Sequence, residues 1–229
     1  MNKLILWDID GTLIYSGGVA GVAMRAAMEQ VYGPTSAVER QAYAGKTDQQ
    51  IILETFADRA HADLVPLLDQ FIAAYLHELE ARRAEFLAHG RILDGVTATL
   101  DRLATLPVIQ SLLTGNLLPI ARFKLDLLGL SHYFDFDAGA FGSDHHMRAN
   151  LVPIAAGRAA QRYGRPFSGQ DVIVIGDTPN DIDCGRAARA RTVAVATGPF
   201  SVEELRAHGA DAVLASLADT DAAIHAILD

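Results

Sequence analysis

The sequence is poor in cysteine and has no long apolar run. Cys184 is the single cysteine among 229 residues, so one chain cannot form an internal disulfide. Because no histidine-partnered pattern surrounds Cys184, we expect a packed thiol and not a nucleophile. No apolar segment approaches the roughly 20 residues that span a bilayer, and the chain opens without a signal-peptide pattern. These absences predict a cytoplasmic protein without a membrane partner.

Positive charge is also scarce. The chain has 19 Lys and Arg against 28 Asp and Glu, which gives a formal net charge of −9. Such a chain is not suited to binding nucleic acid, so any bound anion must be recruited by a local site. Apolar residues make up 50% of the sequence, which is enough for a hydrophobic core. The composition therefore predicts a globular protein, built as one large domain or as a core with a smaller inserted domain.

Two aspartates follow the first apolar run. Residues 4–7 predict a short buried strand, and Asp8 and Asp10 come directly after it. On one strand this spacing places both carboxylates on the same face, where each raises the pKa of the other unless the chain turns or a cation lies between them. Mg²⁺ meets this need because it binds hard oxygen ligands and keeps water that a phosphate can replace. The alternative is a strand end followed by an Asp-Gly turn.

The pattern then becomes helical from residue 16 to residue 89 and contains no convincing strand. Thr47 is a plausible N-cap within this block. The predicted helices cover residues 19–31, 49–60 and 64–88. Because strands and helices alternate again after this block, we predict an α/β core of residues 1–15 and 90–229 and an inserted all-helical cap domain of residues 16–89.

Strands and helices alternate regularly in the second half of the chain. The predicted strands are 108–113, 134–140, 172–175, 193–195 and 212–214, and the predicted helices include 97–104, 119–128 and 151–163. Such a series folds into a Rossmann-like parallel sheet with helices on both faces. Ligands of these sheets bind at the carboxyl ends of the strands.

Three of the predicted strands end in polar side chains at that same edge. The segments are DIDGTL at 8–13, LTGN at 113–116 and GDTPND at 176–181. In this order and with a helical insertion after the first, they closely resemble the motifs of the haloacid dehalogenase-like hydrolase superfamily. Within it, the chain is most similar to the phosphoglycolate-phosphatase type, which has a helical C1-type cap. The resemblance covers nearly the whole sequence.

The resemblance, together with the residue types, assigns roles to the aspartates. A carboxylate can attack phosphorus when the phosphate is held in line and its charge is neutralised, so Asp8 is the expected nucleophile. Asp10 would protonate the leaving oxygen and then deprotonate water, while its backbone carbonyl faces the metal. Asp177 would complete a Mg²⁺ site with Asp8 and Asp10. Asp181 is expected to support this metal site indirectly.

The second motif is expected to bind the phosphoryl group. The Thr114 side chain and the amides of Gly115 and Asn116 can donate hydrogen bonds to its oxygens. The alternative for Thr114 and Asn116 is to cap the helix that follows the strand.

The third motif of the superfamily is usually a lysine, and no lysine follows Lys124 in this chain. Arg148 best matches the position, and a guanidinium can hold a phosphate and a carboxylate together. Lys124 is interpreted as a solvated charge on a helix, and Arg158 lies too far into the next helix. His145 and its neighbour His146 are expected to be exposed loop residues.

Lys46 lies in a segment that resembles the cap loop reading the substrate's leaving group. It could bind a carboxylate or a second phosphate, or it could be an ordinary surface lysine.

Taken together, the motifs predict a Mg²⁺-dependent phosphatase, monomeric or dimeric, that acts on a small phosphorylated metabolite such as phosphoglycolate or a sugar phosphate. A phosphomutase, a phosphonate hydrolase or a non-catalytic binding protein remain alternatives. Asp10 and Asp177 argue against a dehalogenase, which needs neither.

Overall fold

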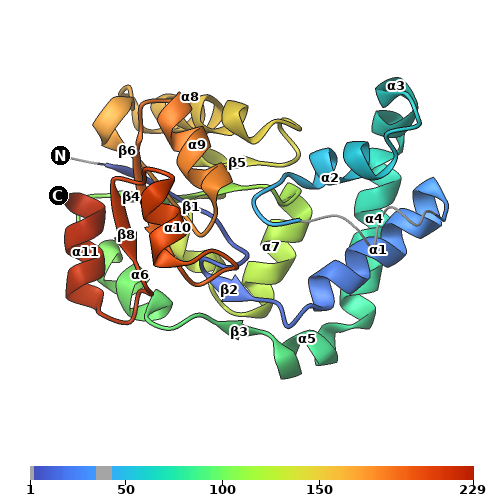
Figure 1. Ribbon diagram of the computed structural model, residues 1–229, viewed down its shortest axis with the longest axis horizontal. Helices are drawn as coiled ribbons and strands as arrows, with labels where there is room; N and C mark the ends of the chain where they lie inside the picture. Colours follow the sequence, from blue (N-terminus) through green and yellow to red (C-terminus); the bar gives the residue numbers. More distant parts are fainter. Residues whose placement is uncertain (1–2, 35–42) are drawn as a thin grey trace.

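The computed structural model describes residues 3–34 and 43–229. Figure 1 shows an α/β unit that contains both ends of the chain, beside a unit made only of helices. Residues 35–42 of the predicted cap lie outside the described part of the chain. Across the described residues, no helix has the length and apolar character needed to cross a membrane.

The α/β unit is built on a six-stranded parallel sheet of order β5-β4-β1-β6-β7-β8. Strand β1 lies near its middle, between β4 and β6. The strands are β1 Leu4–Trp7, β4 Ile109–Thr114, β5 Ala140–Phe141, β6 Val172–Gly176, β7 Arg191–Val195 and β8 Ala212–Leu214. The central position explains why all four residues of β1 are buried and apolar.

Helices cover both faces of this sheet, as the sequence predicted. Ile5 and Trp7 belong to the larger core cluster, whereas Leu4 and Leu6 belong to a second cluster on the opposite face, as the two-residue period of a strand requires. The helices of this unit are α6 Val96–Ala104, α7 Leu118–Leu127, α8 Leu151–Tyr163, α9 Pro179–Ala187, α10 Val202–Ala207 and α11 Thr220–Leu228.

Cys184 of α9 is buried, and burial raises the pKa of its thiol to about 12, which confirms the packed thiol.

One predicted strand is wrong over most of its length. Residues Phe136–Ala138 form a 3₁₀ turn, and the strand β5 covers only Ala140–Phe141. The cause is local, because the Asp135 side chain accepts a hydrogen bond from the amide of Asp137 and closes a turn there.

The helical unit contains α1 and α4 packed side by side (Figure 1). Its helices are α1 Val19–Tyr32, α2 Asp48–Thr55, α3 His61–Leu64, α4 Leu68–Ala81 and α5 Arg83–His89, with a 3₁₀ turn at Val65–Leu67. The helix predicted over 64–88 is therefore interrupted, at Arg82 among other positions, and α2 ends five residues earlier than predicted. The chain enters and leaves this unit through a short antiparallel pair, β2 Ile14–Tyr15 and β3 Arg91–Ile92. The division into core and cap domains remains a prediction.

Candidate active site

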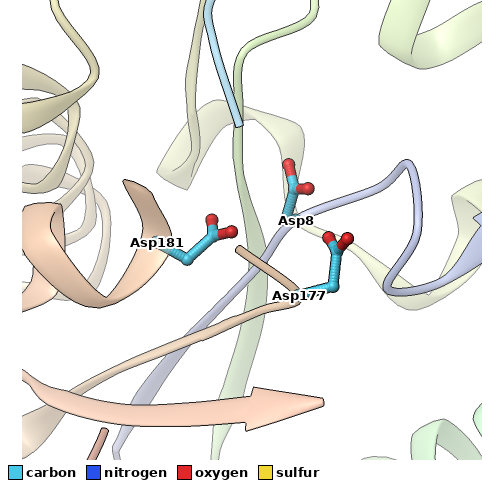
Figure 2. A group of neighbouring side chains, drawn as sticks. All are labelled: Asp8, Asp177 and Asp181. Atoms are coloured by element: carbon cyan, nitrogen blue, oxygen red, sulfur yellow. The ribbon is translucent and has the colours of Figure 1, made fainter. Parts of the chain in front are cut away.

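Three buried aspartates converge at the carboxyl edge of the sheet. Asp8 follows β1, Asp177 follows the neighbouring strand β6, and Asp181 lies in the first turn of α9. One carboxylate oxygen from each lies within 4.8 Å of the others (Figure 2). Their exposed fractions are 5%, 2% and 2%. Because like charges this close and this dry repel each other, the group needs positive charge to stay ionised.

The electrostatics of the cluster show this need. Burial raises the pKa of Asp8 to about 6, with further contributions from the charges of Asp181 and Asp10, although Arg148 opposes the rise. Burial and the charges of Asp8 and Asp181 raise the pKa of Asp177 to about 8. A divalent cation would reverse this repulsion, and three converging carboxylates are the hard oxygen ligands that Mg²⁺ binds. The residues present therefore fit the predicted metal.

Arg148 supplies positive charge to this group of aspartates. It begins a 3₁₀ turn ahead of α8 and is 6% exposed. Its Nη2 atom lies 3.0 Å from Asp8 Oδ1, donates to Asp181 Oδ1, and donates to the Leu113 carbonyl at 3.3 Å. Its Nε is buried and has no hydrogen-bond partner within the described residues. The guanidinium thus lies between Asp8 and Asp181, at the place predicted for the third-motif cation.

The remaining contacts fix Asp177 and Asp181 in place. Thr12 Oγ1 donates to Asp177 Oδ1 at 3.1 Å, a contact the sequence interpretation did not assign. Gly11 has φ +84°, and a Cβ atom there would lie 2.4 Å from Asp177 Oδ2, so only glycine fits. The other oxygen of Asp181, Oδ2, accepts from the backbone amide and the hydroxyl of Thr178 in a capping box at the start of α9.

The second motif lies against the helical unit. A Cβ atom at Gly115 would lie 2.0 Å from the Lys46 carbonyl oxygen, so glycine permits this close approach.

The alternative role in helix capping is wrong for Thr114 and Asn116. Helix α7 begins at Leu118, and the amide of the preceding Leu117 donates instead to Asp48 Oδ2 of the helical unit at 2.9 Å.

The interpretation of Lys124 as a solvated charge is wrong. Its side chain is 3% exposed, and its Nζ donates to Asp10 Oδ2 and to Asn116 Oδ1, each at 2.6 Å. Lys124 lies on the inward face of α7 with Ile120 and Ala121, and this spacing of three and four residues was the signal in the sequence.

The Asp10 carboxylate points to Lys124 and is not one of the three that converge. Asn116 Nδ2 also donates to Asp10 Oδ2, at 2.7 Å. Of the four aspartates predicted at the metal, the described structure therefore brings three carboxylates together. The predicted participation of Asp10 through its backbone carbonyl is compatible with this arrangement and remains a prediction.

A cavity of about 490 Å³ opens from these residues toward the helical unit. Asp8, Asp10 and Arg148 line its floor. The helical unit contributes Met24, Tyr43, Lys46, Ile51 and Tyr75 to its walls.

Lys46 pairs with Glu54, with 2.5 Å between Nζ and Oε2, so its charge is already compensated. Thr47 is the N-cap of α2, as predicted, and its hydroxyl donates to the His146 carbonyl across the two units.

The remaining candidates lie at or beyond the edge of the site. His145 and His146 are half-buried and not exposed, because the ring of His146 packs between those of His145 and His61. Arg158 pairs with Asp144 and takes no part in the cluster.

Asp48 gives the site a testable pH dependence. Burial raises the pKa of Asp48 to about 6, although Lys124 and the Leu117 amide oppose the rise. An ionised Asp48 therefore destabilises the fold. This penalty is full above pH 6 and shrinks as the pH falls from 6 toward the ordinary carboxyl pKa of 3.8. From pH 8 to pH 5, the free energy of unfolding of the wild type should rise by about 1 kcal/mol relative to Asp48→Asn. Urea unfolding of both proteins in EDTA measures the difference, and a gap that does not change with pH would contradict it.

Comparisons with known proteins identify the family. A family model described as haloacid dehalogenase-like hydrolase matches residues 2–189. A phosphoglycolate phosphatase of Pseudomonas syringae pv. tomato is 27% identical over 212 residues, which cover 86% of this chain and 71% of that protein. A phosphoglycolate phosphatase of Chromobacterium violaceum is 25% identical, with 95% of this chain and 94% of that protein covered.

The fold is shared with solved structures. The crystal structure of a hydrolase from Pseudomonas syringae superposes with a TM-score of 0.70 at 20% identity, and each chain is covered completely, at 100%. The family match includes all three acidic and polar strand ends and Arg148. The chain therefore belongs to the haloacid dehalogenase-like hydrolases, as its motifs predicted, and is an enzyme of that family.

Proposed function

We propose that this protein is a Mg²⁺-dependent phosphatase that hydrolyses a small phosphate monoester, phosphoglycolate-like or a sugar phosphate, through an aspartyl-phosphate at Asp8. One observation carries the proposal: Asp8 is buried beside Asp177 and Asp181, is held by Arg148, and lies at the floor of a cavity large enough for a small metabolite. A buried carboxylate with a neighbouring guanidinium is suited to receive a phosphoryl group, because the cation offsets the charge of the incoming anion.

In the first step, an oxygen of Asp8 forms a bond to phosphorus while the bond from phosphorus to the leaving oxygen breaks. Asp10 gives its proton to that oxygen and in the second step takes a proton from the attacking water. Arg148 lines the cavity beside Asp8, and its guanidinium is a proposed donor to a phosphoryl oxygen. The side chain of Thr114 and the amides of Gly115 and Asn116 are the other proposed donors.

Mg²⁺ would be held by the carboxylates of Asp8 and Asp177, with the backbone carbonyl of Asp10 as a further ligand. When bound, it would neutralise charge between the enzyme and the phosphate. Asp181 would act on this site through Arg148 and through the start of α9. The carboxylates of Asp8 and Asp177 belong to the converging group, and the role of the Asp10 carbonyl is what the family resemblance implies.

The named relatives support a small leaving group, because two of them are phosphoglycolate phosphatases. Lys46 lines the cavity and is the proposed contact for an anionic group on the substrate. To serve in this way it must exchange its partner Glu54 for that group. We further propose that the enzyme acts in the cytoplasm as a monomer or dimer.

Phosphate release from a panel of monoesters tests the proposal. The panel contains phosphoglycolate, sugar phosphates and nucleotides, each with Mg²⁺ and with EDTA. We expect metal-dependent release from one or a few members. A purified, folded protein that releases no phosphate from any member would contradict the proposed function, and transfer of the phosphoryl group to a second sugar phosphate would indicate a mutase.

Mg²⁺ binding should also be visible without turnover. A ligand that binds only the folded state raises the melting temperature, so we expect Mg²⁺ to stabilise the wild type by several degrees. Asp177→Asn removes a proposed ligand and should lose most of this increase, whereas Asp183→Asn, at an exposed position of α9, should keep it. Differential scanning calorimetry with and without Mg²⁺ measures the shift. Equal shifts in the Asp177→Asn protein and the wild type would contradict the metal assignment.

A further inference from the structure

We infer that Lys124 is a positioning residue that, with Asn116, fixes the Asp10 carboxylate by one oxygen and leaves the other to exchange a proton with the substrate. The inference rests on the proposed function and adds a role for a buried lysine that the sequence interpretation placed in solvent. Three observations support it: the burial of Lys124, the atoms that it contacts, and the position of Asp10 at the cavity floor.

The burial of Lys124 calls for a specific reason. Removing an ammonium group from water costs several kcal/mol unless hydrogen bonds and a counter-charge replace the water. Lys124 is 3% exposed and has two short contacts, to Asp10 Oδ2 and Asn116 Oδ1, both at 2.6 Å. Asp48 is a second acidic neighbour, because the positive charge of Lys124 opposes the rise of the Asp48 pKa. The lysine is therefore matched to acidic groups at the site and not to solvent.

The contacts at Asp10 distinguish its two oxygens. Lys124 Nζ and Asn116 Nδ2 both donate to Oδ2, at 2.6 and 2.7 Å. Within the described residues, Oδ1 accepts no hydrogen bond. Both side chains line the cavity, but that of Asp10 is 40% exposed, whereas that of Lys124 is 3% exposed. The carboxylate is thus anchored from the protein side and open on the substrate side.

This arrangement suits the two proton transfers assigned to Asp10. As the bond from phosphorus to the leaving oxygen breaks, the proton on Oδ1 moves to that oxygen and leaves Asp10 as a carboxylate. Two donors on Oδ2 stabilise the negative charge that remains. In the second step, Oδ1 takes the proton of the water that attacks the phosphoryl group. Lys124 itself neither gives nor takes a proton in this scheme.

A purely structural role predicts a different outcome from the one that we expect. Lys124 connects α7 to the second motif and to Asp10, so removing it could simply loosen the site. A loosened site would slow the hydrolysis of all substrates alike. A misplaced general acid slows only those reactions whose leaving oxygen needs a proton.

The test compares an alkyl phosphate, whose leaving alkoxide needs a proton, with p-nitrophenyl phosphate, whose leaving group does not. The measured quantity is kcat/KM, because it includes only the steps up to release of the leaving group. We expect Lys124→Met to lower kcat/KM by about 10- to 100-fold for the alkyl phosphate and by no more than about 3-fold for p-nitrophenyl phosphate. Lys124→Arg, which keeps the charge, should recover part of the loss.

A double-mutant cycle with Asp10→Asn completes the test. If Lys124 acts through Asp10, adding Lys124→Met to Asp10→Asn should cause no further loss with the alkyl phosphate. Equal losses on both substrates, or additive losses in the double variant, would overturn the inference while the proposed function stood. A wild type inactive on both substrates would overturn both. If Lys124→Met does not fold, Lys124→Gln is judged by the same two criteria.

Discussion

Replacement of Asp8 by asparagine is expected to abolish phosphate release, lowering kcat by at least about 10⁴-fold. The amide is nearly the same size as the carboxylate but cannot attack phosphorus. Asp8 is buried at the end of the central strand β1. Because asparagine occupies nearly the same volume, the change should leave the fold intact. The measurement is phosphate release with Mg²⁺, on the best substrate of the panel, beside a melting curve of each protein.

Asp183→Asn is the matched control for this experiment. The chemical change is the same, but the Asp183 side chain is 57% exposed on α9 and contacts no member of the acidic cluster within the described residues. It should keep wild-type activity. An Asp8→Asn protein that still turns over at more than a small fraction of the wild-type rate would show that another group carries the phosphoryl transfer.

Replacement of Arg148 by methionine is expected to reduce both stability and activity. The guanidinium is buried between Asp8 and Asp181, so its loss leaves two carboxylates in a dry site without a counter-charge. Breaking a buried pair in this way costs about 3 to 5 kcal/mol. Phosphoryl transfer should slow by at least about 10²-fold, because a proposed donor to the transferred group is lost. Urea unfolding in EDTA and phosphate release with Mg²⁺ measure the two effects.

Arg148→Lys separates charge from geometry at the same position. Lysine is the residue that the superfamily motif usually has there, and it keeps the positive charge but not the fork of donors. We expect it to remain folded and to lose about 10-fold in activity. An Arg148→Met protein with wild-type stability and rate would contradict the role assigned to this arginine.

The parts of the site that the sequence predicted are those fixed locally along the chain. Asp8 and Asp177 each follow a short apolar run, and a run buried on both faces of a parallel sheet must end at the sheet edge, where the other strands also end. Their convergence therefore follows from topology, without knowledge of side-chain packing. Arg148 was predicted on a different ground, because it lies just before a helix, where the resembling family has its third-motif cation.

Lys124 and Lys46 make contacts that depend on tertiary packing. Whether a lysine on a helix faces solvent depends on which side of the helix the rest of the chain covers, and α7 turns Lys124 inward toward Asp10 and Asn116. The pairing of Lys46 with Glu54 likewise depends on how α2 follows its loop. The apolar spacing around Lys124 could be seen in the sequence. The side chain was nevertheless interpreted as solvent-exposed, because it carries a charge.

Chemical trapping of the phosphorylated enzyme tests the central claim most directly. Wild-type protein is mixed with substrate and Mg²⁺, quenched in acid within one turnover, reduced with borohydride and digested for peptide mass spectrometry. Reduction converts an aspartyl-phosphate to homoserine, so the account predicts homoserine at position 8 and none in the Asp8→Asn protein. Homoserine at another aspartate, or none at all from an enzyme that is turning over, would contradict the covalent mechanism at Asp8.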